Sequence, residues 1–498
     1  MLVKLRILLA VLAFLCVCAA FMGPVGLSTC FSFIAALQFV PAVLAWNVAV
    51  IVLLLLATIL LGRVYCSVVC PLGIFQDAVG GVYRLFIPKR RRKAGVYKYR
   101  KPDRRLRVGF LVIFAVLFIL GVANVLGMFA ASFFDPYAIF GRFLGQFMVP
   151  GAHAIQSFVL SRFAEKGVFL ADSLPPVSAF NSVVGIVAAV QIIVVGAIAC
   201  KWGREYCNTV CPVGTVLGFV SRYSLFAPAI DDAKCNGCGL CSRHCKSRCI
   251  DAKEHSIDYS RCVVCLNCTE QCARGAIKFR RRKRAEVKRT ATAGRRAFIA
   301  GAAVASMSVA VSGSPVLAPL KNKQPRKSVV RPVPAGALSR KNLYSRCVAC
   351  QLCVSACPEG VLKPSLSPGE FMQPVMEFSS GFCRPGCTVC SNVCPAGAIK
   401  PVTVAEKSAI KIGTAKVWES ACISAAYGQT CGNCARNCPA GAIEMLAREG
   451  GGLSPIVNAD LCTGCGACEF VCPVGTAGFL SGKSAAICVE GLERHVEI

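Results

Sequence analysis

The sequence predicts a chain in two parts, an α-helical polytopic membrane domain followed by small α+β domains whose interiors are rich in cysteine. Three observations predict this class. Hydrophobic residues make up 55% of the 498 residues, and charged residues make up 16%, below the roughly one quarter of average chains. The apolar residues gather into four long runs before residue 201. Most of the 34 cysteines fall into quartets that begin at Cys235.

The four apolar runs have the length of membrane-spanning helices. A bilayer core of about 30 Å requires about 20 apolar residues. We expect spans at Ile7–Met22, Pro41–Leu61, Val108–Ala131 and Asn181–Cys200. An even number of spans returns the chain to its starting side, so the segment after Cys200 is expected on the side of the N-terminus.

Basic residues assign the sides of the membrane. The chain has 56 Lys and Arg against 25 Asp and Glu, a net charge of +31, and the loop 62–107 alone holds 13 Lys or Arg and two Asp. Such loops lie on the cytoplasmic side of a bacterial inner membrane, where they also contact membrane lipids. The loop 132–180 has balanced charge and is expected in the periplasm. No nucleic-acid-binding signature accompanies the basic charge, so we expect no nucleic acid as partner.

A sequence repeat follows the second and fourth spans. Gly62 to Gly73 reads GRVYCSVVCPLG, and Gly203 to Gly214 reads GREYCNTVCPVG. Both copies end a span that runs inward, so two thiol pairs are expected on the cytoplasmic side, each on one face if the segment is helical. Four thiolates suit a soft metal or an iron–sulfur cluster. The alternative is paired thiols with a structural or redox role and no cofactor. The four candidate metal ligands are Cys66, Cys70, Cys207 and Cys211.

Two cysteine quartets follow the fourth span. Their spacing, C-x2-C-x2-C-x3-C, holds a [4Fe–4S] cluster, and the fourth cysteine of each motif binds the cluster of the other. Structural zinc is the alternative, but zinc sites usually separate two cysteine pairs widely. Proline does not follow the fourth cysteine in either copy, where Lys246 and Ala273 stand instead. We expect one cluster on Cys235, Cys238, Cys241 and Cys272, and a second on Cys262, Cys265, Cys268 and Cys245.

A basic linker follows these two quartets. Residues 278–296 contain ten Lys or Arg and one Glu, and Arg295 and Arg296 precede a modestly apolar stretch. An arginine pair before such a stretch is typical of twin-arginine export, and a fifth membrane span is the alternative. Either interpretation places the following chain in the periplasm. The proline-containing segment 321–340 is expected to be a flexible linker.

Four further quartets fill the rest of the chain. Proline follows the fourth cysteine of each, and several end in Ala-Gly-Ala-Ile or a similar turn-to-strand sequence. Two steps are widened, Cys383 to Cys387 and Cys422 to Cys431, which we interpret as loop insertions. Few long apolar runs occur here, so folding is expected to depend on the cofactor. The expected ligands of four [4Fe–4S] clusters are Cys347, Cys350, Cys353, Cys357, Cys383, Cys387, Cys390, Cys394, Cys422, Cys431, Cys434, Cys438, Cys462, Cys465, Cys468 and Cys472.

These motifs together resemble known electron-transfer subunits. Residues 1 to about 285 resemble the NapH family, with its four spans, twin C-x3-C-P motifs and two-cluster ferredoxin. Residues from about 288 onward resemble the exported four-cluster ferredoxins of the NapG and MauM group, as if the two were fused. The resemblance implies a quinol dehydrogenase that passes electrons from the quinone pool to a periplasmic reductase or cytochrome, as in nitrate reductase systems.

The resemblance also implies how the last four quartets exchange ligands. The outer two quartets would exchange their last cysteines, and so would the inner two. Cys472 would then join the first quartet and Cys357 the fourth, while Cys438 would join the second and Cys394 the third.

The expected fold class is an α-helical polytopic membrane domain followed by ferredoxin-like α+β iron–sulfur domains. The expected cofactors are six [4Fe–4S] clusters, with one further cluster or metal at the twin motifs and quinol as substrate. The expected parts are a four-helix membrane domain at 1–230, a cytoplasmic two-cluster ferredoxin domain at 231–280, the basic linker with its twin-arginine-like segment at 281–340, and a periplasmic four-cluster ferredoxin domain at 341–498.

Two other functions fit the same motifs. One is an electron conduit fed by a cytoplasmic ferredoxin or flavoprotein, which needs no quinol site. The other is a non-enzymatic membrane scaffold or maturation factor whose clusters sense redox state. The sequence contains no C-x-x-C-H motif, no G-x-G-x-x-G opening a βαβ unit and no Walker A motif. Attached c-type haem is therefore excluded, and nucleotide-driven chemistry is not expected.

Overall fold

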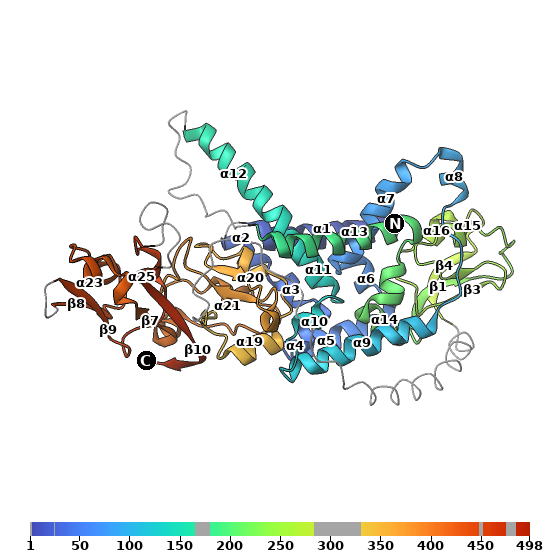
Figure 1. Cartoon of the computed structure of the whole chain (residues 1–498). Coiled ribbons are helices and arrows are strands. Elements are labelled where there is room, and N and C mark those ends of the chain that lie inside the picture. Colours follow the sequence, from blue (N-terminus) through green and yellow to red (C-terminus); the bar gives the residue numbers. More distant parts are fainter. Residues whose placement is uncertain (1, 24, 165–179, 283–329, 448–451, 475–484) are drawn as a thin grey trace. The chain divides into compact units, whose positions relative to one another are not determined.

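The structure is a computed structural model that describes residues 2–23, 25–164, 180–282, 330–447, 452–474 and 485–498. The chain divides into two compact units, whose elements are labelled in Figure 1. Unit 1 comprises Met1–Ala20, Phe31–Leu144 and Ser182–Val309, and unit 2 comprises Phe21–Cys30, Gly145–Asn181 and Ala310–Ile498. The twin motifs and the first two quartets therefore belong to unit 1, and the last four quartets belong to unit 2.

Three helices of the described residues are long and apolar enough to cross a membrane. They are α1 (Leu2–Met22), α9 (Arg104–Val122) and α13 (Ser182–Trp202). Large apolar side chains remain exposed on them, for example Ile119 at 65% and Ile193 at 66%. Long helices with exposed apolar faces need an apolar surrounding, which indicates membrane association.

The second predicted span is interrupted. The structure has two helices there, α4 (Phe39–Leu44) and α5 (Val48–Leu61). Trp46 adopts a left-handed backbone with φ of 55°, and the Asn47 side chain accepts a backbone N–H at 3.3 Å as the N-cap of α5. Helix α5 has 14 residues, or about 21 Å, which is less than the about 30 Å of a bilayer core. The continuous span expected at Pro41–Leu61 is therefore not found, and four crossings stay a prediction.

Both copies of the sequence repeat fold in the same way. Each begins with about one helical turn, α6 (Tyr65–Val68) or the π-helical turn η2 (Tyr206–Val210). The second cysteine of each motif then has extended backbone and N-caps a helix that starts with proline, α7 (Pro71–Leu85) or α14 (Pro212–Ser221). Proline suits this position because the first helical residue needs no N–H partner. The C-x3-C-P spacing thus places two thiols at a bend between helices.

The connection after α9 is part of the core of unit 1. It forms α10 (Phe129–Ser132) and α11 (Pro136–Phe143), and the residues of α11 up to Arg142 are buried. Helix α11 packs against α7 and α13. Hydropathy does not indicate this packing, since the segment mixes aromatic and charged residues. Two short helices complete this part of the unit, α3 (Phe33–Ala36) and α8 (Lys89–Ala94).

The first two quartets form a small α+β fold. Strand β1 (Phe226–Ile230) pairs antiparallel with β4 (Ile277–Arg281), and β2 (Ile250–Asp251) pairs with β3 (Ser256–Ile257). Helices α15 (Leu240–Arg243) and α16 (Asn267–Gln271) each carry the third cysteine of a quartet. The buried core among them is rich in sulfur and aliphatic groups. The predicted ferredoxin-like α+β class is confirmed for this part of the chain.

Three antiparallel strand pairs organise the last four quartets. They are β5 (Leu362–Pro364) with β6 (Pro374–Met376), β8 (Ile443–Ala447) with β9 (Leu453–Val457), and β7 (Ile410–Val417) with β10 (Ile487–Glu497). The β7–β10 pair aligns Ile487 with Val417 and has a bulge before Val496.

The remaining helical elements of the described residues are mostly short. They are α2 (Val25–Phe31), η1 (Leu144–Met148), α12 (Val149–Ala164), α19 (Arg340–Arg346), α20 (Leu352–Ser355), η3 (Pro368–Glu370), α21 (Val389–Val393), α22 (Val404–Ala409), η4 (Glu419–Ala421), α23 (Ile423–Tyr427), α24 (Asn433–Arg436) and α25 (Ala467–Phe470).

The twin-arginine-like segment lies outside the described residues. Arg295, Arg296 and the apolar stretch after them fall within 283–329. The export signal and the alternative fifth span therefore stay predictions. The periplasmic placement of 341–498 depends on them and is a prediction as well.

Candidate functional site

The twin motifs bring four thiols together in the interior of unit 1. Cys66, Cys70, Cys207 and Cys211 are each 4% exposed. Thiols of one motif are close enough to those of the other to interact electrostatically. Gln76, on α7 after the first motif, donates its Nε2–H to the Cys207 sulfur at 3.1 Å. The structure therefore joins the two thiol pairs at one place.

Two buried arginines connect the motifs reciprocally. Arg63 lies at the start of the first motif and donates its Nη2–H to the Cys207 carbonyl at 3.0 Å. Arg204 has the equivalent position in the second motif and donates its Nη1–H to the Cys66 carbonyl at 2.8 Å. Each guanidinium also approaches a thiol, at 3.7 Å from Cys66 Sγ and at 3.9 Å from Cys207 Sγ. The repeated Gly-Arg pair is visible in the sequence, but sequence reasoning missed this role.

A glycine in each motif makes room for these contacts. A side chain at Gly73 would overlap with the Cys66 carbonyl and the Arg204 guanidinium. A side chain at Gly214 would overlap with the Cys207 carbonyl and the Arg63 guanidinium. These are the glycines that follow C-P-x in the two copies, so the repeat preserves a steric requirement of the site.

Asp77 on α7 forms ion pairs with Arg204 and with two further cationic side chains. Its carboxylate lies 2.9 Å from Arg204 Nε, 3.1 Å from Lys246 Nζ and 3.4 Å from Arg6 Nη1. Burial alone would favour the neutral acid, but the surrounding cations hold the pKa of Asp77 well below its ordinary value. The carboxylate is therefore ionised and offsets part of the charge of its neighbours.

Arg63 has no such carboxylate partner in the described part of the chain. Its acceptors are uncharged, the Asn208 Oδ1 at 2.8 Å and the Ser260 carbonyl at 3.1 Å beside that of Cys207. A fully buried guanidinium without a counter-charge costs several kcal/mol. Thiolates at the twin motifs would supply this counter-charge, and metal binding keeps thiols deprotonated. The residues present thus fit an anionic, thiolate-bound centre.

The first two quartets exchange their fourth cysteines as the spacing predicts. Cys245 lines one pocket together with Cys262, Cys265 and Cys268. Cys272 lies beside the other triplet, within electrostatic reach of Cys241. Among the described residues, no group of three or more His, Cys, Asp or Glu side chains has the geometry of a single-metal site.

The twin motifs touch one of these quartet pockets. The Arg204 backbone N–H donates to the Lys246 carbonyl at 2.9 Å, and Lys246 directly follows Cys245. Arg63 donates to the Ser260 carbonyl, two residues before Cys262. Both arginines therefore join the four thiols of the twin motifs to the backbone that carries the neighbouring quartet.

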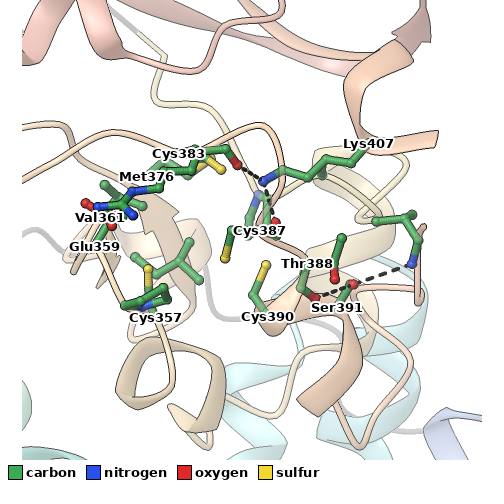
Figure 2. Close-up of a pocket in the computed structure, with 16 residues that line it drawn as sticks. Cys357, Glu359, Val361, Met376, Cys383, Cys387, Thr388, Cys390, Ser391 and Lys407 are labelled. Atoms are coloured by element: carbon green, nitrogen blue, oxygen red, sulfur yellow. Dashed lines mark hydrogen bonds and ion pairs between the residues drawn. The ribbon is translucent and has the colours of Figure 1, made fainter. Parts of the chain in front are cut away.

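In unit 2, three cysteines of each quartet meet the last cysteine of an adjacent quartet. Figure 2 shows Cys357 facing the same space as Cys383, Cys387 and Cys390. Cys394 in turn lies beside Cys347 and Cys353. The same exchange occurs in the other half of the domain. There Cys472 lines a pocket with Cys422, Cys431 and Cys434, and Cys438 lies beside Cys462, Cys465 and Cys468.

This arrangement corrects the pairing that the family resemblance implied. Cys472 was expected with the first quartet and Cys357 with the fourth, Cys438 with the second and Cys394 with the third. The structure instead pairs the first quartet with the second and the third with the fourth. The physical reason is local: the hairpins β5–β6 and β8–β9 return the chain to the next quartet at once, and short loops cost less entropy to close.

Backbone amides support the last cysteine of several quartets. The Ala276 N–H donates to Cys272 Sγ at 3.3 Å and the Ala442 N–H to Cys438 Sγ at 3.3 Å. The glycine just before each donor, Gly275 or Gly441, has φ of 59° or 60°, which turns the amide toward the sulfur. Such donors stabilise a thiolate more than a thiol. The Gly-Ala-Ile sequence shared by 275–277 and 441–443 is the signal of this turn.

Two protein-family models match the chain. A 4Fe-4S binding domain matches residues 43–95 and 182–230, which contain the two C-x3-C-P motifs. A 4Fe-4S dicluster domain matches 346–398 and 429–476. Its first match contains the first and second quartets, in agreement with the pairing of adjacent quartets. No solved structure matches the chain.

Curated relatives are ferredoxin-type proteins. The chain is 32% identical over 176 residues to the methylamine utilization ferredoxin-type protein MauM of Methylobacillus flagellatus, an alignment that covers 34% of this chain and 75% of MauM. The chain belongs to this ferredoxin-type family. It is also 27% identical over 237 residues to the ferredoxin-type protein NapH of Haemophilus influenzae, covering 46% of this chain, and 31% identical over 185 residues to the ferredoxin-type protein MauN of Paracoccus denitrificans, covering 37%.

Family membership establishes the general chemistry. The chain is a 4Fe-4S protein with an electron-transfer role, and its apolar helices associate it with a membrane. The expected likeness to NapH- and MauM-type proteins is confirmed. The chain spans 66% of the length of NapH and 48% of that of MauN. The likeness to NapG, the fusion boundary, the number of clusters and the substrate stay proposals.

Proposed function

We propose that this chain is a quinol dehydrogenase-like component that passes electrons from the quinone pool toward a periplasmic reductase or cytochrome. The six quartets would hold six [4Fe–4S] clusters, and Cys66, Cys70, Cys207 and Cys211 would hold one further centre. Clusters of this kind exchange single electrons, and the protein makes or breaks no covalent bonds in the process. The chain's own residues bind the centres, neutralise their charge and keep adjacent centres close.

The contact between the twin motifs and Lys246 carries this proposal. A centre on the twin motifs would lie between the apolar helices and the pocket of Cys245, because Arg204 is bonded both to the Cys66 carbonyl and, through its N–H, to the Lys246 carbonyl. Such a position suits the first acceptor of electrons from a lipid-soluble donor. The two quartets exchange their fourth cysteines, so the Cys245 pocket adjoins the thiols of Cys235, Cys238, Cys241 and Cys272. These thiols would hold the next cluster of the series.

Unit 2 provides a second series of adjacent pockets. The Cys383 N–H donates to the Cys465 carbonyl at 2.9 Å, which joins the first pair of quartets to the second pair. Gly466 next to this bond packs directly against the buried ring of Phe378, where any side chain would overlap with the ring. The pockets are therefore ordered with the Cys347 and Cys422 groups at the two ends and the Cys383 and Cys465 groups in the middle.

A conduit fed from a soluble cytoplasmic donor is the second candidate. Cys238 is exposed, whereas the four thiols of the twin motifs are buried. An exposed ligand of one cluster gives a soluble ferredoxin or flavoprotein a direct point of electron entry. In this case electrons enter at the Cys238 group, and no quinol site is needed.

The two candidates are separated by the electron donor that reduces the clusters. Full-length protein in its native membranes, prepared without oxygen, is mixed with a reduced quinol analogue or with a reduced soluble ferredoxin, and cluster reduction is followed by electron paramagnetic resonance. Quinol oxidation should reduce the clusters, a quinone-site inhibitor should block it, and Cys66→Ala should abolish it. Cys30→Ala, an exposed cysteine outside the motifs, should leave it unchanged.

Other outcomes would contradict the proposal. Inhibitor-insensitive reduction by the soluble donor alone would favour the conduit. Clusters that neither donor reduces during turnover would favour the redox-sensing scaffold. Equal reduction by quinol in the wild type and in Cys66→Ala would remove the twin motifs from the path.

A further inference from the structure

One quartet pocket contains five thiols. Cys249 lines the same pocket as Cys245, Cys262, Cys265 and Cys268, and it is only 1% exposed. None of the spacing motifs includes Cys249, and four cysteines are sufficient for a cluster. The fifth thiol therefore needs a separate explanation.

Cys249 approaches the expected ligand Cys245 closely. The two sulfurs are 3.5 Å apart, within reach of an S–H···S hydrogen bond and well beyond the about 2.05 Å of a disulfide. The Cys249 thiol is also close enough to the Cys262 sulfur to interact with it. It therefore lies beside two expected ligands of the same cluster and lines their pocket.

The local backbone explains how the fifth thiol reaches this position. Lys246 follows Cys245 where the last four quartets have proline, and Arg248 adopts a left-handed backbone with φ of 53°. The chain therefore turns back within four residues. The Asp258 N–H then donates to the Cys249 carbonyl at 2.8 Å, which holds the residue in place. The absent proline and the extra cysteine are thus two parts of one local departure from the quartet pattern.

We propose that Cys249 is a reserve ligand for the cluster of this pocket. With Cys245 bound to iron, the Cys249 thiol donates its S–H to the Cys245 thiolate. Without Cys245, the Cys249 sulfur binds the same iron in its place, releasing its thiol proton to solvent with no change in oxidation state. The inference rests on the proposed [4Fe–4S] cluster at this pocket, but not on quinol as the donor.

The chain supplies a matched control in the other quartet of the same domain. Cys272 is the equivalent fourth cysteine, and the residue four positions after it is Ala276, whose backbone N–H donates to the Cys272 sulfur at 3.3 Å. No thiol stands there to replace Cys272. Loss of Cys272 and loss of Cys245 should therefore have different consequences.

The test compares iron content and spectra of four variants of the full chain, purified without oxygen. Cys245→Ala should keep the iron content of the wild type with an altered electron paramagnetic resonance signal, because a different thiolate binds the iron. Cys272→Ala should lose about four irons per chain, and so should the double variant Cys245→Ala with Cys249→Ala. Cys249→Ala alone should keep its iron and show a more negative midpoint potential, because a hydrogen bond to the ligand sulfur is lost.

The proposal is overturned if Cys245→Ala loses as much iron as Cys272→Ala. An unchanged midpoint potential in Cys249→Ala would also overturn it, and this variant keeps all four regular ligands, so the result does not depend on how well Cys245→Ala folds. Iron content and potential are measured without quinol. Failure of quinol oxidation would therefore contradict the proposed function and leave this inference intact.

Discussion

Arg63 and Arg204 have equivalent positions in the two motifs, and each donates a hydrogen bond to the backbone carbonyl of the other motif's first cysteine. The distances are 3.0 Å to Cys207 and 2.8 Å to Cys66. This reciprocity is what two repeated halves related by pseudo-twofold symmetry would produce. The two arginines therefore connect the halves and place positive charge beside the same four thiols.

Arg63→Ala should remove the centre at the twin motifs and leave the quartets filled. The substitution deprives the Cys207 carbonyl and the Asn208 Oδ1 of a donor, at about 1–3 kcal/mol for each unsatisfied group, and removes a buried positive charge beside the thiols, whereas the Ser260 carbonyl keeps its bond from Arg107. We expect a loss of about four irons per chain. Iron analysis measures it, with the exposed Arg105→Ala as control. Full iron content in Arg63→Ala would show that the arginine is not needed for the centre.

Gly73→Ala and Gly214→Ala should each destabilise unit 1. The new methyl group overlaps with a cysteine carbonyl and with the arginine from the other motif, and overpacking of this kind costs about 1–3 kcal/mol. Gly81→Ala on the same helix as Gly73 meets nothing within 4 Å and should be neutral or slightly stabilising. Thermal unfolding in detergent compares the three variants. A similar midpoint for Gly73→Ala and Gly81→Ala would contradict the steric argument.

The sequence predicts the four cysteines of the twin motifs but not the hydrogen bonds that hold the two motifs together. The repeat identifies Cys66, Cys70, Cys207 and Cys211, because spacing and a following proline are local properties of the sequence. The bond from Arg63 to Ser260 joins residues far apart in the chain, and no local pattern indicates it. The break at Asn47 was missed for a related reason, since hydropathy averages over a polar cap residue inside an apolar run.

For the last four quartets too, the sequence predicts the ligands but not how they are grouped. All sixteen cysteines are evident from spacing, but spacing does not state which quartets exchange a ligand. The hairpin between Cys357 and Cys383 decides this, and its short strands carry only a weak sequence signal. Cys249 belongs to no quartet, so spacing alone gives it no role, although the absence of proline after Cys245 is a visible departure from the pattern.

Asp77→Asn should destabilise the protein in a pH-dependent way. Burial opposes ionisation, but Arg204, Lys246 and Arg6 hold the folded-state pKa of Asp77 below its unfolded value of about 3.9. The carboxylate therefore contributes stability above that pH, and the contribution is lost as the pH falls through the folded-state value. We expect the difference between wild type and variant to be about 3–5 kcal/mol near pH 7 and to shrink below about pH 4.

Unfolding midpoints across this pH range measure the effect of Asp77→Asn. Glu270→Gln, which changes an exposed carboxylate, serves as the control and should show no comparable trend. A difference between wild type and Asp77→Asn that is constant with pH would mean that the lost charge is not the cause.

The C-terminal quartets are predicted in the periplasm. A reporter that is active only in the periplasm, fused after Ile498, should give a signal. Replacing Arg295 and Arg296 together by lysine should reduce that signal, because the twin-arginine route requires the arginine pair. A signal unaffected by the double replacement would favour the fifth span, and activity of a cytoplasm-only reporter at the same position would overturn the topology.

Replacing any one thiol of the twin motifs should have nearly the same effect as replacing all four. If the four thiolates bind one centre, then Cys66→Ala and Cys207→Ala each remove it, and the double variant adds little, since residues that act as a unit are not additive. Fully loaded protein should hold about 24 irons on the six quartets and about four on the twin motifs. Each single variant should therefore lose about four irons together with quinol-dependent reduction of the quartets, while Cys30→Ala retains both. Additive partial losses of reduction with iron content unchanged would show instead that the two thiol pairs work separately, and the reciprocal arginine contacts would then serve only to hold the halves together.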